Sequence, residues 1–284
     1  MSSAETALVP TAAARTAVPN PTPMRQFVAV LRAEWTKLWS VRSTLWSLLV
    51  TIAIIVGLGA LFCAARVARA DRLDPGELRN FDPTGFSLNG IFLAQLAVGV
   101  LGVLVMSSEY ATGQIRATFG ATPQRNLVLA AKVAVFAVVT FAVGLVACFA
   151  AFFIGQAILG RSTKFHSAFI GDPGVLRAVI GGAMYLSVLG ALGIGLGTIL
   201  RRTAGAIAAL VGLLLILPIL VNFLPSPWNT DISKYLPLQA GNAVFHTAKL
   251  ASTDLSLWVG FAVFCAYAVA SLALGAVLLA RRDA

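Results

Sequence analysis

Charged side chains are scarce in this sequence: Asp, Glu, Lys and Arg make up 11% of its 284 residues, whereas hydrophobic residues make up 58%. Soluble domains usually carry about 25% charged residues, so this composition excludes a soluble enzyme, a secreted disulfide domain and a nucleic-acid-binding domain. Six stretches contain no charged residue, and each is close to or above the roughly 20 residues that cross a bilayer as a helix. These stretches are 45–65, 88–106, 133–155, 178–200, 203–224 and 255–280. The sequence therefore predicts an all-α, polytopic membrane protein with six transmembrane helices.

Catalytic and metal-binding patterns are also absent from the sequence. It contains no G-x-x-x-x-G-K-[ST] motif, no H-E-x-x-H motif and no nucleophile elbow. The three cysteines, Cys63, Cys148 and Cys265, fall in predicted spans without paired spacing, so we expect packing roles for them and no disulfide or metal site. We therefore expect no catalytic residue, no metal and no cofactor on this chain, which is not predicted to be an enzyme.

The six uncharged stretches bear on the mechanism as well. Proton relays and ion-coupled carriers generally use ionisable side chains within the membrane, and these stretches contain none. This counts against a proton-driven antiporter. The polar residues Asn89, Gln95 and Gln156 lie near span ends or are isolated, so we expect structural hydrogen bonds from them.

The segment before the first span divides into two parts. Residues 1–23 are rich in Ala, Thr and Pro without a periodic apolar pattern, which predicts a disordered cytoplasmic tail. Residues 24–44 place Phe27, Leu31, Trp35 and Leu38 at helical spacing, with the basic residues away from this stripe. This pattern is typical of a helix that lies in the headgroup region. A plain aromatic and basic membrane anchor is the alternative.

The remaining residues, 45–284, form the predicted six-span domain, in which the third span is expected to extend over 127–159. Of the 21 Lys and Arg residues, 12 lie in the segments on the side of the termini, and five of these precede the first span. Basic residues favour the cytoplasmic side, so both termini are predicted to be cytoplasmic. The net charge of +10 is spread over span ends rather than gathered with aromatics, which argues against nucleic acid as a partner.

The segment 225–254 between spans five and six is too apolar for a free loop and too interrupted for one spanning helix. It contains Trp228, Tyr235 and Pro237. We expect short re-entrant helices that dip into the outer leaflet; an ordinary surface hairpin is the alternative. Pro218 is expected to kink span five.

Small residues recur every four positions in two spans, which predicts close helix contacts within one chain or between two. Span four contains Ala183, Ser187, Ala191 and Gly195, with Gly193 and Gly197 as a further pair, and span six contains Ala262, Ala266 and Ala270.

The inner segment between spans two and three carries the most specific pattern. It reads S-E-Y-x-T-G-x-I-R-x-T over residues 108–118, followed by P-x-R at 123–125. This run resembles the first intracellular loop of the permeases of ATP-binding-cassette (ABC) transporters of the type 2, or type V exporter, family. The upstream run A-E-W-T-K-L-W-S-V-R-S-T at 33–44 resembles the connecting helix of actinobacterial-type permeases in that family.

The resemblance implies roles for individual residues. Glu109 and Arg116 would make polar contacts with an ATPase subunit, Gly113 would allow close approach, and Tyr110 and Ile115 would seat the loop helix. The alternative for Glu109 and Arg116 is that they snorkel to solvent at the membrane surface. The connecting helix would include Glu34, Trp35, Lys37 and Arg42.

The resemblance also implies a function. The chain would be the permease subunit of an exporter in the bacterial plasma membrane, forming the path for an amphipathic or lipid-like solute. Two copies of a separate ABC ATPase would bind ATP and Mg, and a second membrane subunit, identical or homologous, would complete the path. A non-transporting scaffold or sensor subunit and a secondary carrier are the alternatives.

Overall fold

The computed structural model describes residues 23–72, 74–79, 81–247 and 255–282. Within these residues the chain is helical and contains no strand. Six helical segments are long and apolar enough to span a membrane: α2 (Arg42–Ala68), α5 (Ile91–Ala111), α7 (Arg125–Leu159), α8 (Val175–Leu200), α9 to α10 (Thr203–Asn222) and α13 (Leu257–Arg281). The prediction of six helices that are long and apolar enough to span a membrane is thereby confirmed. The predicted tail lies outside the described residues, apart from Pro23.

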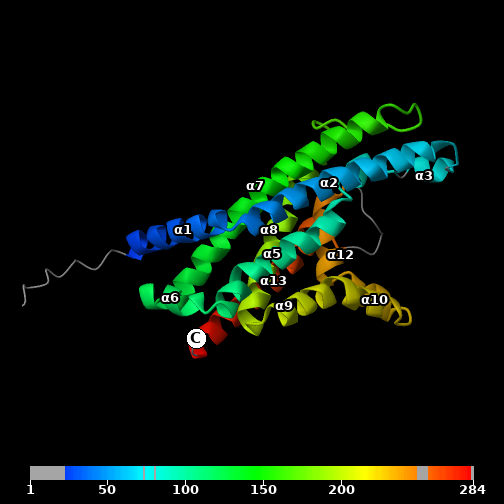
Figure 1. The fold of residues 1–284 in the computed structure, drawn as a ribbon. Coiled ribbons are helices and arrows are strands. Elements are labelled where there is room, and N and C mark those ends of the chain that lie inside the picture. Colours follow the sequence, from blue (N-terminus) through cyan, green and yellow to red (C-terminus); the bar gives the residue numbers. More distant parts are fainter. Residues whose placement is uncertain (1–22, 73, 80, 248–254, 283–284) are drawn as a thin grey trace, which may run out of the picture.

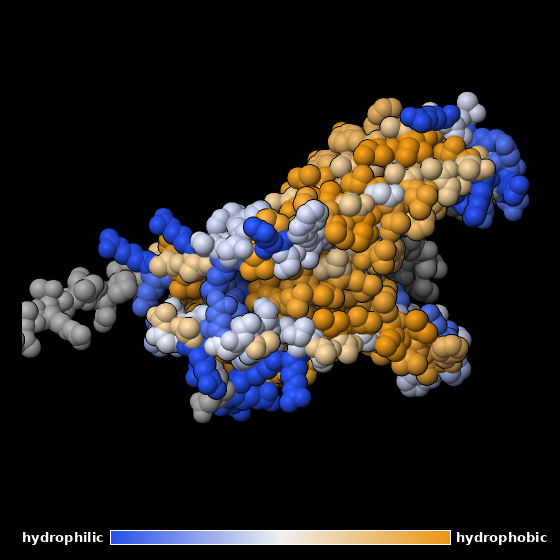
Figure 2. All heavy atoms as spheres, viewed as in Figure 1, coloured by the Kyte–Doolittle hydropathy of each residue, from blue (hydrophilic) through white to orange (hydrophobic). Residues whose placement is uncertain are grey.

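Polar residues gather at the two ends of the molecule, with a broad apolar band between them (Figure 2). Because the number of long helices is even, α1 (Pro23–Ser40) and the end of α13 lie at the same end (Figure 1). The short helix α6 (Gln114–Ala121) lies there too, and we call this the α6 end. The opposite end, near α3 (Pro75–Arg79), is called the α3 end.

Helices α5 and α7 are longer than the uncharged stretches within them. Helix α5 continues to Ala111, and the turn that follows places Gly113 at φ 72°, a left-handed conformation that glycine adopts without steric strain. Helix α7 begins at Arg125, directly after the Pro123 segment. Glu109 and Lys132 therefore lie inside membrane-spanning helices, near the α6 end, although the uncharged stretches exclude them.

Helix α8 lies at the centre of the bundle and packs on α5, α7 and α13. Its glycines let the backbones touch: a Cβ atom on Gly193 would lie 2.5 Å from the carbonyl oxygen of Gly99. The small-residue pattern of span four therefore coincides with close helix contact. In α13, by contrast, Ala262, Ala266 and Ala270 are exposed, and the buried face carries other residues, among them Ser271.

Span five is interrupted where Pro218 predicts a kink. Helix α9 (Thr203–Val211) passes through a π-helical turn, Gly212–Ile216, before α10 (Leu217–Asn222) begins. Pro218 lacks the N–H that would bond to the carbonyl of Leu214, and its ring crowds that carbonyl. The wider turn is the local consequence.

Short helices cover the α3 end. Between α2 and α5 lie η1 (Ala70–Arg72), α3 and α4 (Pro83–Ser87); between α10 and α13 lie α11 (Trp228–Ser233), α12 (Pro237–Asn242) and η3 (Ala243–Phe245). Helix α12 packs on α13, and η3 packs on α8. Pro237 is buried, whereas Trp228 and Tyr235 are exposed. The segment therefore contains short helices, while their re-entrant placement in a membrane stays a prediction and residues 248–254 lie outside the described part.

Candidate functional site

Helix α1 positions two charged side chains against the bundle. It packs mainly on α7, and its buried face carries Val30, Glu34 and Leu38. Trp35 belongs to the apolar stripe expected from the sequence, but it is 47% exposed. The buried face of α1 therefore does not include Trp35. It includes Glu34 instead, because the partner of Glu34, Lys132, lies on α7.

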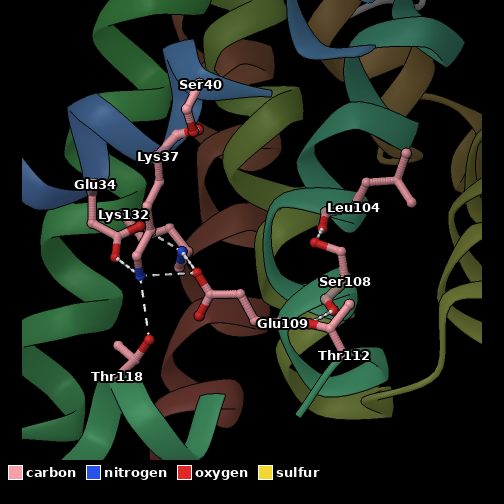
Figure 3. Close-up of polar contacts among 9 residues, drawn as sticks. All are labelled: Glu34, Lys37, Ser40, Leu104, Ser108, Glu109, Thr112, Thr118 and Lys132. Carbon is pink, nitrogen blue, oxygen red and sulfur yellow. Dashed lines mark hydrogen bonds and ion pairs between the residues drawn. The ribbon is translucent and has the colours of Figure 1, made fainter. Parts of the chain in front are cut away.

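Four charged side chains from three helices form a connected cluster at the α6 end (Figure 3). Lys132 on α7 donates to Glu34 Oε2 at 2.5 Å and to Glu109 Oε1 at 2.7 Å. Lys37 on α1 donates to Glu34 Oε1 at 2.7 Å and to Glu109 Oε1 at 3.2 Å. We call Glu34, Lys37, Glu109 and Lys132 the ion-pair quartet.

The quartet is electrically neutral and largely buried. The side chains of Glu34, Glu109 and Lys132 are 5%, 7% and 3% exposed, and that of Lys37 is 31% exposed. Burial of Lys37 disfavours its charged form, but the hydrogen bond and charge of Glu34, together with those of Glu109, raise its pKa above the ordinary value. Buried charges persist only when they are paired in this way.

The quartet also reaches the loop helix. Lys37 Nζ donates to Thr118 Oγ1 on α6 at 3.3 Å. Helices α1, α5, α6 and α7 are therefore joined through one hydrogen-bonded group. Lys132 was missed as a site residue by the sequence analysis, although a signal exists: it is the only charged residue between Arg125 and Arg161, and an isolated charge in an apolar helix needs a partner.

The other predicted coupling residues separate into an inward and an outward group. Ile115 is 3% exposed and packs in a core cluster with the partly buried Tyr110, while Arg201 lies over the Tyr110 ring at 5.0 Å. Gly113 and Arg116 are exposed. Arg42, at the start of α2, is also exposed. The structure therefore brings Glu34, Lys37 and Glu109 together and leaves Arg116 and Arg42 outside the quartet.

A cavity of about 270 Å³ lies beside the quartet, between α1, the start of α2, α5 and α7. Glu34, Lys37, Glu109 and Lys132 all line it. The second oxygen of Glu109, Oε2, is buried and has no hydrogen-bond partner among the described residues. Glu109, one of the residues that line the cavity, thus has a buried carboxylate oxygen that can accept a further hydrogen bond.

A second polar cluster holds the α3 end together around Asp82. Its carboxylate accepts from the backbone N–H groups of Thr84 and Gly85 at 3.1 and 3.0 Å, which caps α4. It also accepts from the Thr247 N–H at 2.9 Å and the Thr247 hydroxyl at 2.5 Å, and His246 Nδ1 lies 3.5 Å away. Burial opposes the charged form, but these bonds, led by the His246 contact, lower the pKa of Asp82 well below its usual range.

Asp82→Asn should lower stability and flatten its dependence on acid pH. Because the folded-state pKa is lowered, the carboxylate contributes stability above about pH 4, and this is lost as the pH falls towards the folded-state value. We expect the free energy of unfolding to fall by roughly 1 to 3 kcal/mol at neutral pH, which is the usual cost of leaving a buried hydrogen-bonding group without its partner. Thermal unfolding of the purified protein from neutral to acid pH measures both effects. Asp231→Asn, at an exposed carboxylate, is the control; identical pH profiles for Asp82→Asn and the wild type would contradict the prediction.

Two of the three amides predicted to be structural, Gln95 and Gln156, form internal hydrogen bonds, whereas the Asn89 side chain forms none among the described residues. Gln156 Nε2 donates to the Pro83 carbonyl at 3.0 Å and to Ser87 Oγ at 2.9 Å, and its Oε1 accepts from Ala168 N at 2.7 Å. Gln95 accepts from the Tyr185 hydroxyl. These contacts join spans to each other and to segments at the α3 end.

In the part of the chain that the structure describes, no three His, Cys, Asp or Glu side chains lie together as potential metal ligands. No protein-family model matches this chain, and no curated protein matches it either. The quartet, the cavity and the exposed face of α6 are therefore the features from which a function is inferred.

Proposed function

We propose that this chain is the transmembrane permease subunit of an ABC exporter, in which a separate ATPase drives an amphipathic or lipid-like solute along the membrane bundle. The observation that carries the proposal is the link between α6 and the spans. Helix α6 projects between α5 and α7 at the polar end of the bundle, and Thr118, through Lys37, connects it to Glu109 and Glu34. A displacement of α6 would therefore act on α1, α5 and α7 together.

Exposed and buried residues of the loop are proposed to have different roles. Arg116 and Gly113 are exposed and are proposed to contact the ATPase. Glu109 is buried and is proposed to act as a positioning residue, since its carboxylate holds Lys132 and Lys37 instead of facing solvent. Ile115 seats α6 on the bundle.

The wider assembly follows from the same proposal. Two ATPase copies would bind ATP and Mg, and a second membrane subunit, identical or homologous, would complete the solute path in a bacterial plasma membrane. Helix α1 would lie at the inner interface with Trp35 and Trp39, both exposed, at headgroup level, where tryptophan is enriched. The exposed Trp228 and Tyr235 would place α11 and α12 in the outer leaflet as re-entrant helices.

Copurification tests the proposal directly. The tagged chain, expressed with its neighbouring reading frames, should bring down a protein with a nucleotide-binding domain, and solute movement in vesicles should require ATP. A chain that copurifies without any ATPase and transports nothing would be a scaffold or sensor subunit instead.

Arg116→Ala should weaken ATPase copurification by about tenfold or more, because truncating one member of a desolvated charged pair commonly costs about 2 to 5 kcal/mol at an interface. The amount of ATPase retained per mole of permease, measured by quantitative immunoblot, gives the effect. Arg72→Ala is the matched control, because Arg72 is exposed at the α3 end. Small and equal effects at both positions would favour solvated snorkelling of Arg116.

A secondary carrier is the second candidate, and the quartet favours it. The six long stretches without charged residues argued against ion coupling. However, Glu34, Glu109 and Lys132 are buried at the α6 end, and buried ionisable side chains are what ion-coupled carriers generally use. Proteoliposomes containing this chain alone distinguish the two candidates. Uptake driven by a proton or sodium gradient would support the carrier, whereas transport only with the ATPase and ATP would support the exporter.

The proposed orientation predicts accessibility from each side of the membrane. In a background lacking Cys63, Cys148 and Cys265, a cysteine at Thr230 should react with an impermeant thiol reagent in intact cells, and one at Gln114 should react only after permeabilisation. A second outer position is needed near the α3 end. Ala70 lies there but is buried, so a cysteine at the adjacent, exposed Asp71 should also react in intact cells. Labelling of Gln114 from outside would reverse the assignment.

A further inference from the structure

We propose that the cavity beside the ion-pair quartet binds an amphiphile whose head is a neutral hydrogen-bond donor, such as a hydroxyl or an amide, and whose chain is apolar. The proposal concerns ligand binding by this chain alone, so it is independent of the ATPase partner.

The cavity has one polar side and one apolar side. Five hydroxyl-bearing residues line it, from α1, α2 and α5, together with the quartet. Leu38, Leu101, Leu104, Val105 and Val135 supply the apolar wall. Figure 3 shows Ser40 and Lys37 on one side and Ser108 on another helix on the other side. Such a lining fits a ligand with a polar head and an apolar body.

The buried Oε2 atom of Glu109 favours a ligand that carries a hydrogen-bond donor. Oε1 accepts from both lysines, whereas Oε2 has no hydrogen-bond partner among the described residues. A buried acceptor without a partner costs about 1 to 3 kcal/mol relative to a satisfied one. This oxygen is closed off from the cavity in the structure, so a ligand O–H or N–H would reach it as the carboxylate turns towards the cavity, and would then remove that cost.

An anionic head does not fit the same space. Lys37 Nζ donates to Glu34, Glu109 and Thr118, which uses its three protons. Lys132 is 3% exposed and bridges both glutamates. No arginine lies among the described residues that line the cavity. A phosphate or carboxylate would therefore add a negative charge beside Glu109 while both lysine charges are already paired with the two glutamates.

A cationic head is disfavoured by the charge balance. The two lysines and two glutamates cancel, so an added ammonium would place an uncompensated positive charge beside Lys37 and Lys132. Burying an unpaired charge is costly. A neutral donor gains a hydrogen bond to an ionised acceptor, which is stronger than a neutral one, without this cost.

The size and position of the cavity fit the head and first part of the chain. Its volume of about 270 Å³ is just below the range of roughly 300 to 1,000 Å³ typical of sites that enclose a drug-sized ligand. Val41, Ser43 and Ser108 at its rim are exposed, between the start of α2 and the end of α5. A longer chain would leave through this opening, at the inner end of the apolar band.

Native mass spectrometry of the whole chain released from phosphatidylcholine nanodiscs provides the test. Glyceryl monolaurate, lauric acid and laurylamine share one chain and differ in the head. We expect one retained adduct of glyceryl monolaurate, with affinity higher by about tenfold or more than for the other two, which corresponds to roughly one hydrogen bond.

Two filling substitutions from different helices locate the site. Ser47→Phe on α2 and Ser108→Phe on α5 should each abolish retention, because both residues line the cavity. Ala111→Phe is the matched control, since Ala111 is exposed and outside the lining. A monodisperse size-exclusion profile confirms that each variant is folded.

Several outcomes would overturn the proposal. These are no adduct, equal retention of the acid or the amine, retention unaffected by either filling substitution, and retention of phosphatidylethanolamine in place of glyceryl monolaurate when that lipid is included in the nanodiscs. The last result would assign the cavity to a membrane lipid.

Discussion

Lys132→Met should be among the most destabilising single substitutions in this protein. It removes the side chain that bridges Glu34 and Glu109 at 2.5 and 2.7 Å and leaves two buried carboxylates with only Lys37 between them. Removing one partner of a buried ion pair typically costs about 3 to 5 kcal/mol. We expect a large fall in the yield of folded protein and in its unfolding temperature, measured by fluorescence-detected size exclusion after heating.

The double variant Lys132→Met with Glu109→Gln separates charge from packing. It restores neutrality, because Lys37 and Glu34 remain as a pair at 2.7 Å. We therefore expect it to be more stable than Lys132→Met alone, so that the two substitutions are not additive. Additive losses would show that charge balance is not what the quartet maintains.

Lys164→Met provides the exposed comparison at the α3 end. Its ion pair with Asp71 is short, at 2.5 Å, but the two side chains are 43% and 91% exposed. Exposed pairs contribute about 0 to 1 kcal/mol, so this variant should resemble the wild type. A loss as large as that for Lys132→Met would mean that burial does not determine the effect.

Gly193→Leu should prevent correct packing of the central helix. Even a Cβ atom at this position would lie 2.5 Å from the Gly99 carbonyl oxygen and 3.1 Å from the Val103 backbone nitrogen. These are backbone atoms, so α8 and α5 would have to move apart along their whole contact. Overpacking commonly costs about 1 to 3 kcal/mol and more where backbone must shift, and we expect aggregation on size exclusion.

Gly205→Leu is the matched control for the glycine prediction. Gly205 lies in α9, and a Cβ atom there would meet no atom within 4 Å. Leucine favours a helix by about 1 kcal/mol over glycine, so this variant should be at least as stable as the wild type. Normal folding of Gly193→Leu would show that the α5–α8 contact tolerates separation.

The sequence by itself determined the features that depend on neighbouring residues. Uncharged runs specify the six spans because a bilayer imposes one length and one polarity on every crossing helix. Pro218 identified the irregular turn of span five because proline removes a hydrogen bond within its own helix. The short helices between spans five and six followed from an apolar segment interrupted by Pro and Gly. Six long apolar helices in this order were thus predictable from the sequence.

Contacts between helices were decided only by the tertiary structure. The small-residue pattern is the same in spans four and six, yet α8 uses it inside the bundle whereas Ala262, Ala266 and Ala270 are exposed. Likewise, the spacing on α1 identified a helix and an apolar stripe, but Trp35 lies outside the contact with α7 and Glu34 lies inside it. Periodicity reports which residues share a face, and it carries no information on what that face meets.

The ion-pair quartet shows the same limit at the candidate site. Glu34 and Lys132 are 98 residues apart in the chain, and Glu109 and Lys132 are 23 apart. Each alone is ordinary for the end of a span, where a long side chain can reach solvent. The packing of α1 and α5 on α7 removes that solvent, and the charges must then pair with one another. The sequence determined which helices are long and apolar enough to cross a membrane. Tertiary packing decided that these charges are buried, because burial depends on every neighbouring element together.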